Sequence, residues 1–152
     1  MLVFETISDF KKMVGKELPL GNWYTITQEM INDFANATSD KQWIHVDEAK
    51  AAKESHFKST IAHGFMSVAM ISKLLEEAFT IKSLKMGLNY GLNKVRFPNA
   101  VPVKSQLRML SKVLDIQPLE NNGVKATFSC ILEIKGQEKP ACVAEFLAAF
   151  YE

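Results

Sequence analysis

The sequence has little of what marks several large functional classes. Its net charge is only +1 over 152 residues, so charge gives no reason to expect nucleic acid or an anionic membrane as a partner. No apolar run approaches the roughly 20 residues of a membrane-spanning helix, and the N-terminus shows no secretory signal, which predicts a cytoplasmic protein. The GxGxxG, Walker A and GxSxG motifs are missing, so dinucleotide, nucleotide and serine-hydrolase chemistry lack support.

Cysteine is also scarce. Cys130 and Cys142 are the two in the chain, and they do not form a CxxC pair. Both lie in strand-like apolar stretches, so they become near neighbours if those strands form a hairpin. In a chain without an export signal, two reduced thiols in the core are the expected state.

What is present is the composition of an ordinary globular domain. The sequence is 47% hydrophobic and 23% charged, and a chain of this length buries roughly 68–70% of its unfolded surface. We find no linker and no internal repeat, so we expect residues 1–152 to form a single domain. The first half is mostly helical in pattern and the second half mostly strand-like, which favours an α+β fold.

The longest predicted helix begins at Gly64 or Phe65 and ends at about Phe79. Its first three turns are apolar nearly all round, which is typical of a buried helix. Three shorter helices are predicted to follow the capping residues Ser8, Thr27 and Asp47. Strands are expected at 18–26, 84–97, 106–116, 124–134 and 141–151, with hairpin turns at 121–123 and 135–138.

These elements together predict the hot-dog fold, in which an antiparallel β-sheet wraps around one long central helix. The last strand is apolar on both faces except for Glu145, so it should lie centrally and be covered on both sides. A single copy of such a sheet leaves much of its surface unprotected. We therefore expect a homodimer.

Asp40 and His45 are the first candidate chemical pair. They are five residues apart, a spacing that separates side chains by about 140° on a regular α-helix. They converge only if the helix ends between them and the chain turns back. A converged pair is suited to acid–base chemistry. The alternative is that Asp40 is a turn residue and His45 a buried histidine that bonds to a backbone carbonyl.

His63 and Gly64 form the second candidate. The first-turn N–H groups of a helix have no partner within it and carry partial positive charge, and a glycine there lets a substrate carbonyl approach closely. The alternative is that Gly64 only lets the loop enter the helix. Ser72 interrupts an apolar stretch eight residues further on, and such a serine more often bonds to a carbonyl one turn earlier.

Metal binding has weaker support from the sequence. The three histidines are His45, His56 and His63, and Asp40 and Asp47 lie nearby. No spacing among them matches HExxH or a zinc finger. We expect neither a metal nor a bound cofactor.

The combined motifs resemble those of the MaoC-like dehydratase family, which includes the (R)-specific enoyl-CoA hydratases. The chain has D-K-Q-W-I-H at 40–45 and I-A-H-G at 61–64, where the family has Asp, four residues and His, then a hydrophobic-x-His-Gly step into the central helix. V-R-F-P at 95–98, P-V at 102–103 and L-R at 107–108 extend the similarity, which runs from about residue 10 to the C-terminus. The first motif is especially similar to the nodulation protein N-like branch.

The resemblance implies a role for each matching residue. Asp40 and His45 would be the catalytic pair, with Asp40 favoured as the base and His45 orienting a water. Which of the two moves which proton stays open. The Gly64 amide would be the oxyanion donor, and His63 and Ser72 would contact the substrate.

The implied activity is hydration of a trans-2-enoyl thioester to an (R)-3-hydroxyacyl-CoA, or the reverse dehydration, with the coenzyme A thioester as substrate. Gln42-Trp43 stands where many family members have Asn-Pro, so Trp43 would reshape the substrate pocket. Lys94, Arg96 and Lys73 are candidates to hold the phosphates of coenzyme A. The alternatives are a hot-dog acyl-CoA thioesterase and a non-catalytic acyl-CoA-binding subunit.

Overall fold

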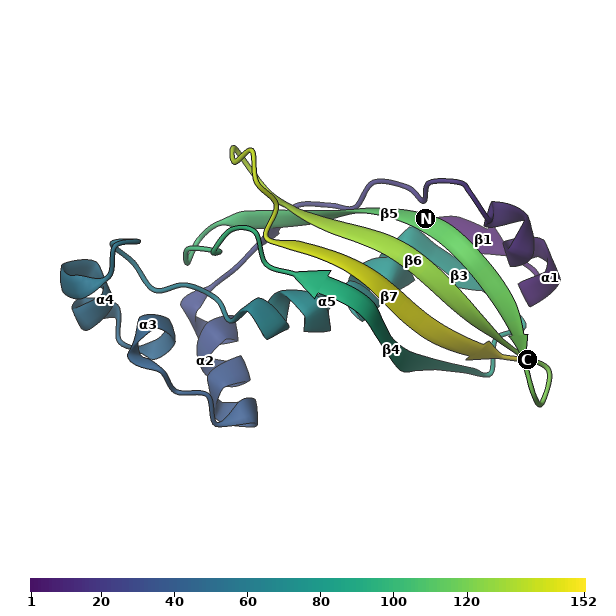
Figure 1. The fold of residues 1–152 in the computed structure, drawn as a ribbon, viewed down its shortest axis with the longest axis horizontal. Coiled ribbons are helices and arrows are strands. Elements are labelled where there is room, and N and C mark those ends of the chain that lie inside the picture. Colours follow the sequence, from purple (N-terminus) through teal and green to yellow (C-terminus); the bar gives the residue numbers. More distant parts are fainter.

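The computed structural model describes all of residues 1–152 (Figure 1). Helix α5 (Gly64–Ala78) packs against a sheet whose five antiparallel strands lie in the order β2–β5–β6–β7–β4. The strands are β2 (Tyr24–Thr25), β4 (Met86–Arg96), β5 (Gln106–Leu119), β6 (Gly123–Ile134) and β7 (Cys142–Tyr151). A long helix against a curled antiparallel sheet confirms the predicted α+β, hot-dog fold.

The two ends of the sheet carry different elements. At one end, β1 (Leu2–Phe4) pairs in parallel with β3 (Phe79–Ile81), next to α1 (Ile7–Phe10) and the 3₁₀ turn η1 (Lys11–Met13). At the other end lie α2 (Gln28–Thr38), α3 (Trp43–Val46) and α4 (Glu48–Glu54) (Figure 1). The first end is packed by aromatic rings with centroids 4.5–6.4 Å apart, from Phe10, Phe79, Phe128 and Phe150.

The predicted helix caps are correct at two of three positions. Thr27 and Asp47 each accept a hydrogen bond from a first-turn amide of α2 and α4. The cap predicted at Ser8 is wrong, because Thr6 caps α1 instead. The earlier start places both apolar residues of α1 in the core.

The strand predicted at 18–26 forms only at its end, as β2. Before β2, the amides of Leu18 and Gly21 donate to carbonyls of β5, so the chain follows that strand irregularly. Pro19 lies between them and has no amide hydrogen, which prevents a continuous ladder.

Helix α5 is buried along one face rather than all round as predicted. Its buried residues are Met66, Ser67, Ile71, Leu74, Leu75 and Ala78. Phe65, at its first turn, is 66% exposed. The reason is that the sheet of one copy covers only one side of the helix. No helix in the structure is both long and apolar enough to cross a membrane.

The central place predicted for the last strand is confirmed, since β7 lies between β6 and β4. The two cysteines face the core from β6 and β7 and are free thiols. Burial raises the pKa of Cys130 to about 12 and that of Cys142 to about 11. Thiols with such high pKa values are unreactive at neutral pH, which fits the predicted structural role.

Candidate active site

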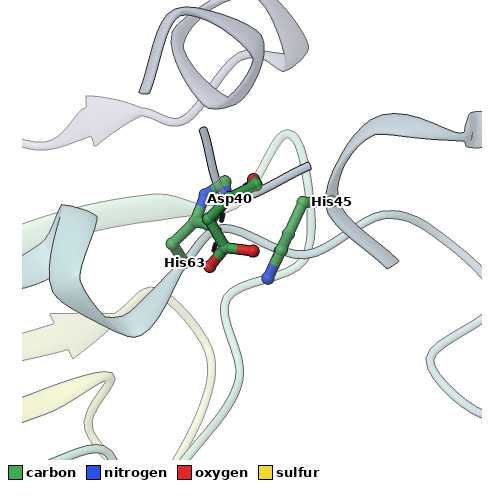
Figure 2. A group of neighbouring side chains, drawn as sticks. All are labelled: Asp40, His45 and His63. Atoms are coloured by element: carbon green, nitrogen blue, oxygen red, sulfur yellow. Dashed lines mark hydrogen bonds and ion pairs between the residues drawn. The ribbon is translucent and has the colours of Figure 1, made fainter. Parts of the chain in front are cut away.

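Three polar side chains gather beside the N-terminus of α5 (Figure 2). Asp40 lies in the loop between α2 and α3, His45 lies on α3, and His63 is the residue immediately before α5. Helix α2 ends at Ser39, whose left-handed backbone (φ 61°) turns the chain back toward α5. The fold-back that the spacing of Asp40 and His45 required is therefore present.

His45 is held in one orientation. Its side chain is buried, and its Nδ1 lies 2.6 Å from the carbonyl oxygen of Ile61. In the neutral ring that nitrogen donates its proton to Ile61, which leaves the lone pair on Nε2. Burial lowers the pKa of His45 from 6.5, and the neighbouring His63 lowers it further; the hydrogen bond to Ile61 and the charge of Asp40 oppose this only in part. His45 is therefore a neutral hydrogen-bond acceptor at pH 7.

Asp40 is the exposed partner of this pair, with 57% of its side chain open to solvent. One of its carboxylate oxygens, one ring nitrogen of His45 and one of His63 all lie within 4.8 Å of one another. One water that donates to two acceptors at about 2.8 Å each can bridge such a gap. The sequence-predicted pair is thus brought together, at a separation that one bridging water can span.

His63 lies behind the pair rather than at a surface open to substrate. It is 3% exposed, and its ring stacks on that of His45 with 3.8 Å between centroids. Its Nε2 donates to the main-chain carbonyl of Asp40 at 2.9 Å, and its Nδ1 is buried without a partner. In this structure His63 contacts both members of the pair.

Gly64 opens a cavity of about 250 Å³ that also has His45 in its wall. The side chain of His63 does not cap α5, because its ring is bonded to Asp40. The first-turn amides of α5 therefore keep their partial positive charge beside the cavity. A Cβ atom at position 64 would lie 2.9 Å from the ring of Phe97, so glycine is what lets this ring pack so close to the helix.

The other predicted substrate contacts are not at this cavity. Ser72 donates to the Asn89 side chain at 2.7 Å and lines a separate cavity of about 230 Å³ between α5, β4 and β7. Trp43 begins α3, and the Lys50 ammonium lies 4.9 Å from the centre of its ring. Instead, the structure adds Phe97 to the cavity wall.

Two further wall residues, Ser67 and Asn99, were not singled out from the sequence. Ser67 lies three residues after Gly64, and that helical spacing is the signal that places it on the same face. Nothing in the sequence indicates that the loop carrying Asn99 returns to the start of α5.

The predicted cations divide into two groups. Lys94 and Arg96 are exposed on β4, and Arg96 directly precedes Phe97 at the cavity. Lys73 lies two and a half turns along α5 from Gly64, where it forms an ion pair with Glu77. Its position and its ion pair separate Lys73 from the cavity.

The cluster of Asp40, His45 and His63 also has the composition of a metal site. A metal would need an unprotonated nitrogen from each histidine. The Nε2 of His63 is committed as a donor to the Asp40 carbonyl, and the Nδ1 of His45 is committed to Ile61. Each ring keeps one nitrogen outside these hydrogen bonds, Nε2 of His45 and Nδ1 of His63.

The fold and the site together define a hot-dog protein in which Asp40 and His45 lie beside a helix N-terminus that no side chain caps. The comparisons agree with this class. Residues 9–132 match the family model for the MaoC like domain. The chain belongs to the MaoC-like dehydratase family, which confirms the predicted resemblance and the hydratase/dehydratase class of enzyme.

Individual relatives cover nearly the whole chain. It is 46% identical over 150 residues to 3-hydroxyacyl-thioester dehydratase Z of Mycobacterium tuberculosis, covering 99% of each protein. It is 37% identical to nodulation protein N of Rhizobium meliloti, covering 94% of this chain and 89% of the relative. The unliganded (R)-hydratase of Pseudomonas aeruginosa superposes with a TM-score of 0.75 over 98% of this chain and 87% of that one; at 23% identity, this likeness shows the shared fold.

Proposed function

We propose that the protein adds water to a trans-2-enoyl-CoA to give an (R)-3-hydroxyacyl-CoA, and catalyses the reverse dehydration. The observation that carries this proposal is that His45 and the Gly64 end of α5 share one cavity, with the Asp40 carboxylate beside them. The 3-hydroxyacyl-thioester dehydratase among the relatives supports the reaction class.

The thioester carbonyl binds at the start of α5 in this proposal. Attack at C3 moves the C2=C3 electron pair toward the carbonyl and places negative charge on its oxygen. The Gly64 N–H and the partial positive charge of the first turn stabilise that enolate. The loss of one such donor typically costs about 10²–10³ in rate.

The attacking water sits between Asp40 and His45. Its oxygen bonds to C3 while one of its protons passes to Asp40, and Asp40 then delivers a proton to C2. His45 accepts a hydrogen bond from the same water at Nε2, because Nδ1 is occupied by Ile61. General acid–base assistance of this kind contributes about 10²–10⁴-fold. Roles for these residues rest on their geometry and on the family motif.

The coenzyme A portion lies outside the cavity, and no separate cofactor takes part. Arg96 is the best-placed cation for its phosphates, because it adjoins Phe97 at the cavity wall, and Lys94 is two residues earlier on the same exposed strand. Trp43 does not line the cavity, so in this proposal it contacts only the part of the substrate that lies outside it. Two inert buried thiols fit a cytoplasmic enzyme.

We further propose that residues 1–152 act as one domain and that two copies pair through β4. This strand bonds only to β7, so its other edge is open. Four of its apolar side chains are more than a third exposed, namely Met86, Leu88, Tyr90 and Leu92. A long, apolar, unpaired edge strand favours pairing with another strand. A second copy of β4 would satisfy both the edge and its apolar side chains.

Crotonyl-CoA hydration tests the activity. We expect purified protein to remove the absorbance of the enoyl thioester without releasing a thiol, and the product to be the (R)-3-hydroxy isomer on chiral analysis. Thiol release would indicate a thioesterase instead. Tight binding of acyl-CoA without turnover would indicate a non-catalytic subunit.

A further inference from the structure

We infer that Gln28 is a positioning residue for His45, a role that no sequence motif indicates. The inference rests on the proposed function for its effect on turnover, but its structural part concerns His45 alone. Gln28 is the first residue of α2 and is half-buried between α3 and the segment that leads into α5. It does not touch the cavity, so it acts through His45.

The side-chain amide of Gln28 is fully used. Its Nε2 donates to the main-chain carbonyl of His45 at 2.8 Å and to the exposed side chain of Asn32 at 2.9 Å. Its Oε1 accepts the hydroxyl proton of Thr60, which is 1% exposed, at 2.5 Å. One amide therefore joins three segments that are separate in the sequence.

These bonds hold His45 from two directions. The main chain of His45 is bonded to Gln28, and its ring is bonded to Ile61, the neighbour of Thr60. Ile61 also donates its amide to the carbonyl of Ile44 at 3.0 Å. Gln28 thus fixes the distance between α3, which carries His45, and the carbonyl that sets its tautomer.

Only a carboxamide satisfies both ends of this bridge. The carbonyl of His45 needs a donor, and the hydroxyl of Thr60 needs an acceptor. A glutamate would place a second acceptor against the His45 carbonyl, and a leucine would leave both buried partners without a hydrogen bond. The expected result is a displaced His45, and displacement of a catalytic group by 1 Å can cost about 10²-fold in rate.

The experiment compares Gln28→Leu and Gln28→Glu with the matched control Asn32→Ala. The control removes the exposed partner of the same amide and leaves His45 and Thr60 bonded. We expect both Gln28 variants to lose about 10- to 100-fold in kcat with crotonyl-CoA, with less than about a threefold change in KM, because substrate binding does not use this bridge. We expect Asn32→Ala to match the wild type.

Two measurements separate positioning from general destabilisation. In ¹⁵N-histidine NMR of the full chain, which has three histidines, we expect wild-type His45 to be protonated at Nδ1 when neutral. In the Gln28 variants we expect the Nε2-protonated tautomer to increase and the His45 pKa to rise toward 6.5, since the loosened α3 admits water. His63 also lowers the pKa of His45 and Asp40 raises it, and both residues are unchanged in every variant.

Two substitutions at Thr60 test the same bridge if the Gln28 variants do not fold. Thr60→Val removes the hydroxyl and should reproduce the kcat loss, whereas Thr60→Ser keeps it and should restore activity. Folded Gln28→Leu or Thr60→Val protein with wild-type kcat and an unchanged His45 tautomer would overturn the inference. A wild-type enzyme without hydratase activity would instead reject the proposed function, and the NMR result would still decide the role of Gln28.

Discussion

His45 donates its Nδ1 proton to the main-chain carbonyl of Ile61 across 2.6 Å, so one backbone atom selects the tautomer of the neutral ring. Ile61 lies two residues before His63 and three before Gly64. The same short segment therefore orients the imidazole and begins the helix that faces it. The position of the loop carbonyl therefore decides which nitrogen of His45 carries the proton.

The pH dependence of turnover should report this arrangement. Because burial lowers the pKa of His45 below 6.5, the ring becomes protonated only at a lower pH than a free histidine does. We expect the acidic limb of kcat/KM for crotonyl-CoA to be centred below pH 6.5. An acidic limb centred at or above 6.5 would show that His45 is not the group that must be neutral.

Asp40→Asn tests the proposed base directly. Asparagine is similar in size and keeps the main-chain carbonyl that His63 binds, but it does not accept a proton. We expect kcat to fall by about 10²–10⁴-fold with little change in thermal stability. Asp33→Asn is the control, because Asp33 is an exposed carboxylate on α2, away from the cavity. Unchanged turnover in Asp40→Asn would reject Asp40 as the base.

Gly64→Ala tests how closely the substrate approaches α5. The new methyl group would lie 2.9–3.0 Å from three ring atoms of Phe97, so the ring must move into the cavity or the start of the helix must shift. We expect a loss of about 10²-fold in kcat/KM. Phe97→Leu in the same chain should recover part of that loss, because leucine leaves space for the methyl group. A fully active Gly64→Ala single variant would remove the Gly64 amide from the mechanism.

Charges placed on β4 test the proposed dimer. We expect the wild type to elute at twice the chain mass in size-exclusion chromatography with light scattering, and Leu88→Lys/Leu92→Lys to elute as a monomer, since lysine on an edge opposes strand pairing. Leu110→Lys on β5 is the control, because Leu110 is an apolar residue of similar exposure (37%) on another strand. Dissociation by Leu110→Lys alone would place the interface elsewhere.

Local signals predicted most of the fold. Capping at Thr27 and Asp47, alternation along the long strands and the extent of α5 depend on nearby residues, and each was correct because neighbouring side chains determine it. The Ser8 cap was a local error of two residues, and the other two errors arose where distant partners decide the outcome. Pro19 interrupts a segment whose pairing depends on β5, and the exposure of Phe65 depends on which side of α5 the sheet covers.

The site shows the same division. The pairing of Asp40 with His45 followed from a spacing that requires the helix to end, and Ser39 supplies that end. Gln28 could not be predicted, because two of its three partners, His45 and Thr60, come from other segments and bond to it through an amide of no distinctive pattern. Ser67 was missed because a serine within a buried helix is usually structural.

The residues assigned to proton transfer all lie on the stretch from α2 to the start of α5, at the end of the sheet opposite the aromatic cluster (Figure 1). The proposed catalytic residues and the aromatic core therefore lie at opposite ends of the sheet. The five-stranded sheet contains none of residues 27–64, so substitutions in this stretch can change the proposed chemistry while the sheet keeps its strand register.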